Sequence, residues 1–372
     1  MKKVNGFQII EQFEDFSPKK YALEGDKIGL QVGSLNKNVE RVMITLDVLE
    51  EVVDEAIEKQ IDLIIAHHPP IYNALKNLVT DKGQGRIFEK LIKNDIAVYV
   101  AHTNLDVAQG GVNDLLAEAL LLENTNILVP SFEEDLSKLV VYVPEEAADE
   151  VRKALGESGA GHIGNYQNCS FSSSGTGRFL PLKESNPYIG SQGKAEEVTE
   201  VRIETIVEQS LEQKLIKTML KAHPYEEPAY DVIKLKQKGR TLGLGRIGSL
   251  KEPMSLEAFA QFVKKQLKVE GVRFVGHKKE TVKKVAVLGG DGNKYIHAAK
   301  FKGADVLVTG DLYFHTAHEA MMLGLNVVDP GHHVEKVMIK GVAKILERKM
   351  IERNFKVEII QSETNTNPFT IV

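Results

Sequence analysis

Short apolar runs alternate with amphipathic helical patterns along the first third of the chain. The segment Ile61–Ala66 is apolar apart from Asp62 and predicts a buried strand. Strands are also predicted at 41–46 and 96–101, and helices by apolar residues at helical spacing around 49–57, 87–92 and 112–120. Strands separated by helices of this length indicate βαβ units with a mostly parallel sheet.

The last third of the chain repeats this plan. Strands are predicted at 284–288, 304–309 and 325–328, and helices at 295–301, 314–323 and about 333–350. Val42 and Asp62 in the first two strands lie 20 residues apart, as do Val285 and Asp305 in the later pair. Any two βαβ units can produce this spacing, and a duplicated domain would produce it too. If the duplication is real, the strand ends of both parts face one cleft.

The pattern changes between residues 131 and 236. Strands at 138–143, 200–207 and 229–235 are predicted together with helices at 145–155 and 210–222, an order that suits a ferredoxin-like α+β module. The segment 158–193 is rich in Gly and Ser and predicts no regular element. The sequence therefore predicts one α/β domain made of two related halves, 1–130 and 237–372, interrupted by an α+β insert at 131–236.

Composition narrows the class of protein. The chain has 372 residues, a net charge of −5 and one cysteine, Cys169. A single cysteine forms no internal disulfide, which favours a reducing cytoplasm. The N-terminal segment lacks the apolar run of a signal peptide, and no stretch is long and apolar enough to predict a membrane span. The slightly acidic balance argues against a nucleic-acid-binding surface.

Two adjacent histidines, His67 and His68, end the predicted strand 61–66 and precede two prolines. Ligands of open α/β sheets bind outside the carboxyl ends of the strands, so both imidazoles can face one cleft there. Imidazole suits zinc, iron, nickel and copper. For this dipeptide on its own, two ordinary histidines at a turn are the alternative.

Two further segments place metal-binding side chains just beyond predicted strands. Asp106 follows the strand 96–101, while His332 and Glu335 follow the strand 325–328 and can share a helical face. Each carboxylate has an alternative role at a helix N-terminus. Together the candidates are too many for one four-coordinate ion but fit two adjacent ions, with Asp106 as the bridging carboxylate. The predicted ligands are His67, His68, Asp106, His332 and Glu335.

The motifs that contain these residues resemble a known family over essentially the full length. The motifs are Asp26–Gly33 (DKIGLQVG), His67–Pro69 (HHP), His102–Asp106 (HTNLD), Gly110–Asp114 (GGVND) and Gly331–His333 (GHH). In this order they resemble the NGG-interacting-factor-three-like family of dinuclear metal-centre proteins, whose bacterial members are often labelled GTP cyclohydrolase type-two homologues. The segment His223–Asp231 (HPYEEPAYD) resembles the PII/CutA-like insert of the longer members.

This resemblance implies a dinuclear centre, with zinc or iron in different members, between two related α/β halves. Carried over by motif, the ligands would be the five residues named above. Shorter members place the glutamate four residues after the first histidine of the Gly-His motif. Glu335 lies three residues after His332, which leaves His332 and His333 as alternative ligands. The resemblance also implies a toroidal homohexamer with metal sites facing an internal cavity and inserts capping its openings.

Two functions remain open at this point. In the first, the protein is a metal-dependent hydrolase whose ions activate water against a nucleotide, a phosphoester or a purine ring. In the second, it is a non-catalytic metal-binding assembly whose insert senses a small molecule or binds a partner protein. The second function stays open because a set of metal ligands identifies a binding site without identifying a reaction.

Three other segments are weaker candidates. Asp311, His315 and His318 follow the strand 304–309 and can support the ligands or contact substrate, or the two histidines can be ordinary helix residues. The glycine-rich segment 239–246 lacks the Lys-Ser/Thr ending of a P-loop, which favours a domain junction. The loop 289–292 can bind an anion ahead of a helix or simply form a turn.

Overall fold

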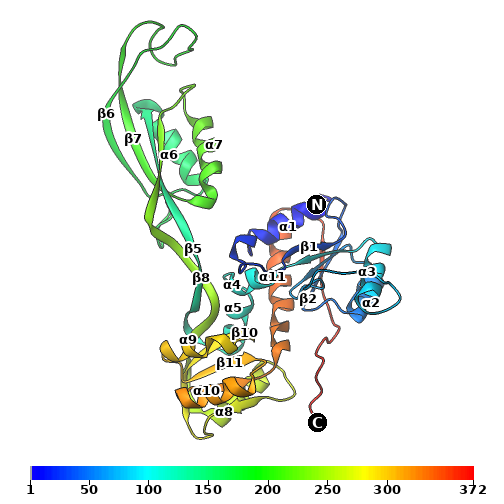
Figure 1. Ribbon diagram of the computed structural model, residues 1–372. Coiled ribbons are helices and arrows are strands. Elements are labelled where there is room, and N and C mark those ends of the chain that lie inside the picture. Colours follow the sequence, from blue (N-terminus) through cyan, green and yellow to red (C-terminus); the bar gives the residue numbers. More distant parts are fainter. Residues whose placement is uncertain (1) are drawn as a thin grey trace. The chain divides into compact units, whose positions relative to one another are not determined.

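A computed structural model describes residues 2–372, and the chain forms two compact units (Figure 1). One unit consists of Met1–Phe132 together with Leu242–Val372, and the other is Glu133–Thr241. The chain passes from one unit to the other within two long strands, β5 (Glu123–Pro144) and β8 (Tyr230–Ser255). The first unit therefore combines segments from both ends of the chain.

The first unit contains a five-stranded sheet in the order β1-β4-β3-β2-β13. Its central strands β2, β3 and β4 pair in parallel, with Ile44 opposite Ile65 and Ile65 opposite Tyr99. At the edges, β1 is antiparallel to β4 and β13 is parallel to β2. The bounds are β1 (Gly29–Val32), β2 (Arg41–Thr45), β3 (Leu63–Ala66), β4 (Ala97–Val100) and β13 (Glu358–Gln361). Parallel strands buried on both faces read as continuous apolar runs, which is why the three central strands were predictable.

The first unit also holds the strands β8-β10-β11-β12-β9 of an eight-stranded sheet. Here β10, β11 and β12 are parallel, while β8 and β9 flank them in antiparallel orientation. The bounds are β9 (Arg273–Val275), β10 (Thr281–Asp291), β11 (Val306–Gly310) and β12 (Asn326–Asp329). The chain thus contains two sheets in a mixed α/β fold, as the coarse pattern predicted.

Helices connect the strands of the first unit and join its two sheets through one core. That core contains Ile65 of β3, Val308 of β11 and the α11 side chains Met338 and Leu346. Each fully buried side chain of this size contributes about 1.5–3 kcal/mol, so the core holds the strand ends of both sheets in a fixed relation. The helices are α1 (Gly6–Glu14), α2 (Glu50–Glu58), α3 (Gly83–Lys93), α4 (Thr103–Val107), α5 (Val112–Ala119), α8 (Leu256–Gln266), α9 (Ile296–Phe301), α10 (Phe314–Leu323) and α11 (Val337–Glu352), with 3₁₀ turns η1 (Lys19–Tyr21), η4 (Asn293–Tyr295) and η5 (His332–Lys336).

The second unit contains the remaining strands of the eight-stranded sheet and a hydrophobic core of its own. Antiparallel pairing joins β5 to β7 (Glu196–Glu208) and β7 to β6 (Ser170–Phe179). The helices α6 (Ala148–Glu157) and α7 (Glu212–Ala222) follow the 3₁₀ turns η2 (Glu145–Ala147) and η3 (Gln209–Leu211). Val141 of β5, Leu155 of α6 and Leu215 of α7 are fully buried together. The strand and helix order is β5-α6-β6-β7-α7-β8.

One prediction for this unit is wrong. The segment 158–193, expected to be irregular, contains the ten-residue strand β6, which pairs with β7 from Ser170 opposite Thr205 to Phe179 opposite Glu196. Most β6 side chains are exposed, so the strand has no apolar alternation that the sequence could reveal. Backbone pairing with β7, and not burial of side chains, makes this segment a strand.

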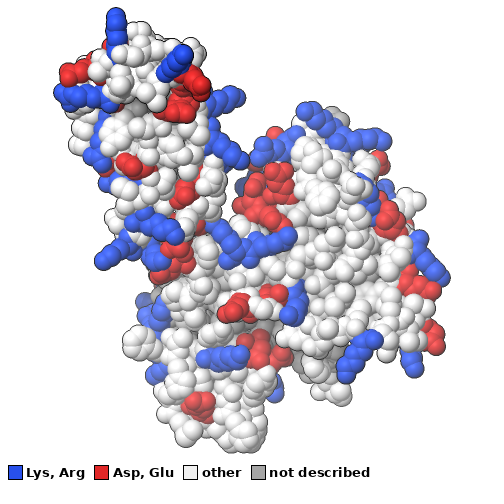
Figure 2. Space-filling model, turned by 45° about the horizontal axis from the view of Figure 1, so that its top comes forward, with Lys and Arg blue, Asp and Glu red and all other residues white. Residues whose placement is uncertain are grey.

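The surface carries charges of both signs. On the face drawn in Figure 2, Lys and Arg side chains are interspersed with Asp and Glu, which is typical of a solvated protein surface. Among residues 2–372, no helix combines the length and the apolarity needed to cross a bilayer.

Candidate metal centre

The carboxyl ends of adjacent parallel strands bring three predicted ligands to one place. His67 and His68 directly follow β3, and Asp106 lies on α4, the short helix after β4. Because β3 and β4 are parallel, with Ala66 opposite Val100, their carboxyl ends lie at the same edge of the sheet. This placement agrees with the prediction from strand ends.

The second sheet supplies the other two predicted ligands from η5, which follows β12. Gly331 has a φ of 84°, a left-handed conformation that favours glycine, and it turns the chain from β12 into η5. His332 and Glu335 then lie three residues apart in a 3₁₀ turn, with the Glu335 side chain buried. The helix predicted from about residue 333 therefore begins as this tighter turn, and α11 starts at Val337.

Glu335 lies at the middle of the cluster. Its Oε2 atom lies 3.0 Å from His68 Nε2, 3.1 Å from His332 Nε2 and 3.8 Å from His67 Nε2. Asp106 Oδ1 lies 3.7 Å from the same His67 nitrogen. Two groups of side chains that could each hold a metal ion share Glu335. They are His67, Asp106 and Glu335, and His68, His332 and Glu335.

His102 joins the cluster although the sequence pattern did not single it out as a ligand. It forms a third group with His67 and His68 that could hold a metal ion, and its ring centroid lies 5.2 Å from that of His67. His102 follows β4 almost directly, so the strand-end rule that found the other ligands applied to it as well. One carboxylate beside two histidines already completes a plausible metal site, so the sequence pattern alone does not require His102 as a ligand.

Each of the four imidazoles is held at Nδ1 by an oxygen atom outside the ligand set. The pairs are His67 with the Ala101 carbonyl at 2.9 Å, His68 with Asp47 at 2.7 Å, His102 with Asp26 at 2.8 Å and His332 with Asp311 at 2.6 Å. Donation of the Nδ1 proton to these acceptors fixes the ring and leaves Nε2 for a metal ion. Histidine ligands of metal sites are usually oriented in this way.

Two buried polar atoms of the cluster have no hydrogen-bond partner among the described residues, His67 Nε2 and Asp106 Oδ1. They face each other across 3.7 Å, which is too long for a hydrogen bond. Leaving a buried polar atom unpaired costs about 1–3 kcal/mol. Two ligands of a tetrahedral zinc ion, each about 2.0–2.2 Å from it, lie about 3.3–3.6 Å apart. The residues present therefore fit a metal ion that both atoms would bind.

Charge and burial shift the proton affinities of the cluster. Burial, reinforced by the charge of Glu335, raises the pKa of Asp106 to about 6. Burial alone would lower the pKa of His68, but its hydrogen bonds with Asp47 and Glu335 raise that pKa to about 10. The hydrogen bond with Glu335 is the main cause that raises the pKa of His332 to about 9. Metal ions would thus compete with protons for these nitrogens.

Glycines allow the second sheet to approach the ligands. A Cβ atom added at Gly289 would lie 2.8 Å from Glu335 Oε1, and one added at Gly310 would lie 2.8 Å from the His332 backbone nitrogen. Asn113 links the two sides, because it accepts from the Gly289 N–H and donates to the Asp106 carbonyl, both at 3.0 Å. The absence of a side chain at Gly289, in the segment 289–292, thus leaves space for the Glu335 carboxylate.

Of the three candidate residues that follow β11, only one contacts the cluster. Asp311 contacts the cluster through its hydrogen bond with His332. His315 and His318 lie on α10, where their rings pack against Phe314 at centroid distances of 5.5 and 4.5 Å. Neither histidine belongs to a group of described residues that could hold a metal ion.

A cavity of about 960 Å³ opens beside the cluster. His68 and His332 line it from the ligand set, and His333 lines it without belonging to any of the three groups found in residues 2–372. Much of the remaining wall is apolar, and it includes Leu46, Val272, Pro330 and Phe369. The cluster therefore adjoins a space that a small molecule could enter.

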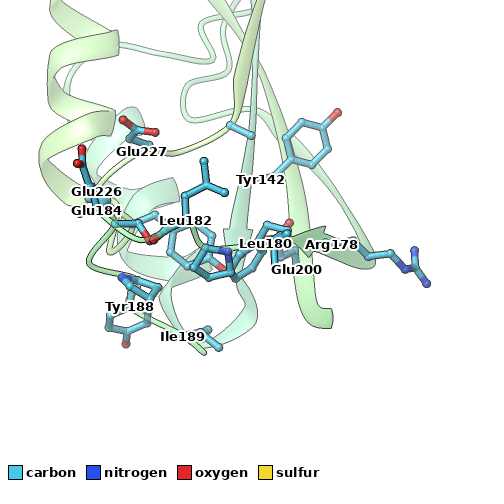
Figure 3. Close-up of a pocket in the computed structure, with 17 residues that line it drawn as sticks. Tyr142, Arg178, Leu180, Leu182, Glu184, Tyr188, Ile189, Glu200, Glu226 and Glu227 are labelled. Atoms are coloured by element: carbon cyan, nitrogen blue, oxygen red, sulfur yellow. The ribbon is translucent and has the colours of Figure 1, made fainter. Parts of the chain in front are cut away.

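The second unit contains a separate cavity of about 690 Å³ (Figure 3). Glu184, Glu226 and Glu227 gather on one side of it, while Leu180 and Leu182 lie at its middle. Tyr225, from the HPYEEPAYD segment, also lines it and donates a hydrogen bond to Glu200 at 3.1 Å. This cavity combines apolar walls with carboxylates.

Comparison with known proteins identifies the family. The sequence model of Duf34/NIF3 (NGG1p interacting factor 3) matches residues 4–368. A Bacillus subtilis protein named GTP cyclohydrolase 1 type 2 homolog is 61% identical over 371 residues, which cover 100% of both chains. A Bacillus cereus protein related to NIF3 has a similar crystal structure, with a TM-score of 0.96, 60% identity and 100% of both chains covered. A Staphylococcus aureus crystal structure matches with a TM-score of 0.80 and 32% identity, again over 100% of both chains. As its motifs predicted, this chain belongs to the Duf34/NIF3 family.

Proposed function

We propose that this protein binds two divalent metal ions at the cluster and is a metal-dependent hydrolase acting on a nucleotide, phosphoester or purine-ring substrate. The observation that carries the proposal is the position of Glu335, whose Oε2 atom lies within 3.8 Å of three imidazole nitrogens. Because two groups of potential ligands meet at this carboxylate, two ions can share it. Zinc or iron suits the site, since both accept imidazole and carboxylate ligands.

The bridging role suits Glu335 better than Asp106, to which the sequence pattern assigned it. Asp106 contributes to one of the two groups, whereas Glu335 contributes to both. In this arrangement His67 and Asp106 hold one ion together with Glu335, and His68 and His332 hold the other. His102 can provide a further ligand beside His67 and His68.

Two ions bound here would supply hydroxide at neutral pH and stabilise negative charge that develops on the substrate. The protein's own contribution is to fix the ligands and to bind the substrate beside them. The cavity of about 960 Å³ has the size of a small-molecule site, with apolar walls that suit a purine ring. Arg273 also lines the cavity, and its side chain is 73% exposed. Its guanidinium can therefore bind a substrate phosphate while it remains paired with Asp329. The name of the Bacillus subtilis relative supports the purine-nucleotide class.

The proposed hydrolase is tested by comparing wild type with Asp106→Asn. Wild type purified without chelator should carry about two ions per chain, and the variant should lose about one of them and at least about 100-fold in turnover. Metal content is measured by plasma mass spectrometry, and turnover by a screen of nucleotides, phosphodiesters and GTP. Asp149→Asn is the control, because the Asp149 side chain is 96% exposed and lies in the second unit. Wild type without bound metal would contradict the proposal.

A second candidate function is a non-catalytic, metal-binding assembly in which residues 131–236 form a ferredoxin-like, PII/CutA-like sensor between two related halves, 1–130 and 237–372. The order β5-α6-β6-β7-α7-β8 supports this kind of insert. The cavity of about 690 Å³ in the second unit favours binding of a small molecule there. Two ions per chain in wild type without turnover on any substrate class would favour this function.

We also propose that the chain assembles into a toroidal homohexamer. Large apolar side chains are exposed on two helices that contact each other, Phe301 on α9 and Phe314 and Met322 on α10. Phe301 is 93% exposed and Met322 is 83% exposed, and such apolar surface usually marks a protein interface.

Light scattering after size-exclusion chromatography tests the hexamer. Six chains of 41.3 kDa should give a mass of about 250 kDa for wild type, and Met322→Glu should shift the mass to smaller species because it places a charge in the interface. Lys278→Glu, on an exposed loop, serves as the control and should keep the wild-type mass. A wild-type monomer at micromolar concentration would exclude the assembly.

A further inference from the structure

The segment that follows the last strand is tied to the first unit by side chains. After β13, the Ser362 N–H donates to the Ile44 carbonyl at 3.0 Å. Glu55 of α2 then accepts from the hydroxyls of Ser362 and Thr364, each at 2.7 Å, and from the Glu363 N–H at 2.9 Å. These contacts hold residues 362–364 against β2 and α2, and they set the position from which the chain continues to Thr366.

Thr366 contacts the carboxylate that holds one of the candidate metal ligands. Its hydroxyl donates to Asp47 Oδ2, while the other oxygen of the same carboxylate, Oδ1, accepts from His68 Nδ1 at 2.7 Å. A carboxylate held at both oxygens cannot turn about its Cβ–Cγ bond without breaking one of these contacts. The Thr366 residue itself is buried. The orientation of the His68 ring therefore depends on a residue near the end of the chain.

We infer that Thr366 is a positioning residue, which sets the affinity of the centre for metal through Asp47 and His68. The inference rests on the proposed binding of metal at this cluster. Loss of the direct partner of a histidine ligand typically costs 10–100-fold in metal affinity. Thr366 acts one contact further out, so the expected loss is about two- to tenfold, the contribution of one hydrogen bond.

The coupling must also act in the opposite direction. If the Thr366 contact strengthens metal binding, metal binding strengthens that contact by the same factor. The same segment lines the cavity beside the cluster with Thr366, Asn367, Pro368 and Phe369. A bound metal should therefore order the wall of the proposed substrate cavity as well as the ligands themselves.

Three variants of the full-length chain test the inference: Thr366→Val, Thr364→Val and Thr366→Ser. Thr364→Val is the matched control, because it removes an equivalent hydroxyl that contacts Glu55 and not Asp47. Ser362 and Glu363 still hold the segment through Glu55 in that variant. Zinc affinity is measured by competition with a chelator, and Co²⁺ substitution reports the ligand geometry through its visible spectrum. We expect Thr366→Val to weaken zinc binding about two- to tenfold and to shift the Co²⁺ bands, Thr364→Val to do neither, and Thr366→Ser to restore both.

Hydrogen exchange on wild type measures the reverse coupling without any variant. The amides of residues 362–367 and of Phe369 should exchange more slowly with zinc than without it. Equal zinc affinities of Thr366→Val and Thr364→Val would overturn the inference, because both substitutions would then act on the segment alone. Unchanged exchange on zinc binding would overturn it even if Thr366→Val failed to fold. A wild type that binds no zinc would instead refute the proposed metal centre, so the two failures are distinguishable.

Discussion

Replacing Glu335 with Gln is expected to reduce the metal content from about two ions per chain to fewer than about 0.5. The reason is that Glu335 belongs to both groups of potential ligands, with Oε2 at 3.0 Å from His68 Nε2 and 3.1 Å from His332 Nε2. An amide removes the negative charge that balances the ions and offers one oxygen in place of two. Plasma mass spectrometry after purification without chelator measures the result.

The matched control for this change is Glu319→Gln. Glu319 also pairs with a histidine, His297, at 2.7 Å, but it is exposed on α10. Its variant should keep the wild-type metal content. Loss of only one ion from Glu335→Gln would contradict the bridging role of this carboxylate and return that role to Asp106.

The proposed ligands could be selected from the sequence because they depend on one local rule. His67, Asp106 and His332 each come shortly after a buried parallel strand, and an apolar run reveals such a strand without any knowledge of the fold. The residues that hold the imidazoles follow no such rule. Asp26 lies 76 residues from His102, and Thr366 lies 319 residues from Asp47, so only the folded chain brings them together.

The strands show the same distinction. Local hydrophobicity predicts the buried central strands, whereas an edge strand that forms by pairing with a distant segment cannot be predicted in this way. The central strands β2, β3 and β4 were predicted because their side chains are buried on both faces. The strand β13 was not predicted, since its side chains are exposed or only partly buried and show no apolar run that is continuous. It joins the first sheet beside β2, with Ile360 opposite Met43, although it lies at the other end of the chain. Pairing partners this distant leave no signal in local hydrophobicity.

The glycine-rich segment 239–246, interpreted as a domain junction, contains the residue with the largest expected effect on folding. Arg246 is buried, and its guanidinium donates to both oxygens of Asp114 on α5, with Nη2 at 2.8 Å from Oδ2. The same side chain donates to the carbonyls of Gly243 and Gly245 at 2.9 and 2.8 Å. Within the first unit, Arg246 thus donates to four acceptor atoms and links β8 to α5.

Arg246→Met is expected to lower the free energy of unfolding by about 3–5 kcal/mol. The thioether side chain fills similar space, but among the described residues it leaves Asp114 with only the Gly110 N–H, at 2.6 Å from Oδ2, and removes the guanidinium donor from two backbone carbonyls. Breaking a buried ion pair on one side costs more than the intact pair contributes. Urea denaturation followed by circular dichroism measures the change. Arg348→Met is the control, because Arg348 is 69% exposed and lies 3.7 Å from Glu352, a surface pair that contributes less than about 1 kcal/mol. Equal effects of the two substitutions would mean that the contacts of Arg246 do not stabilise the fold.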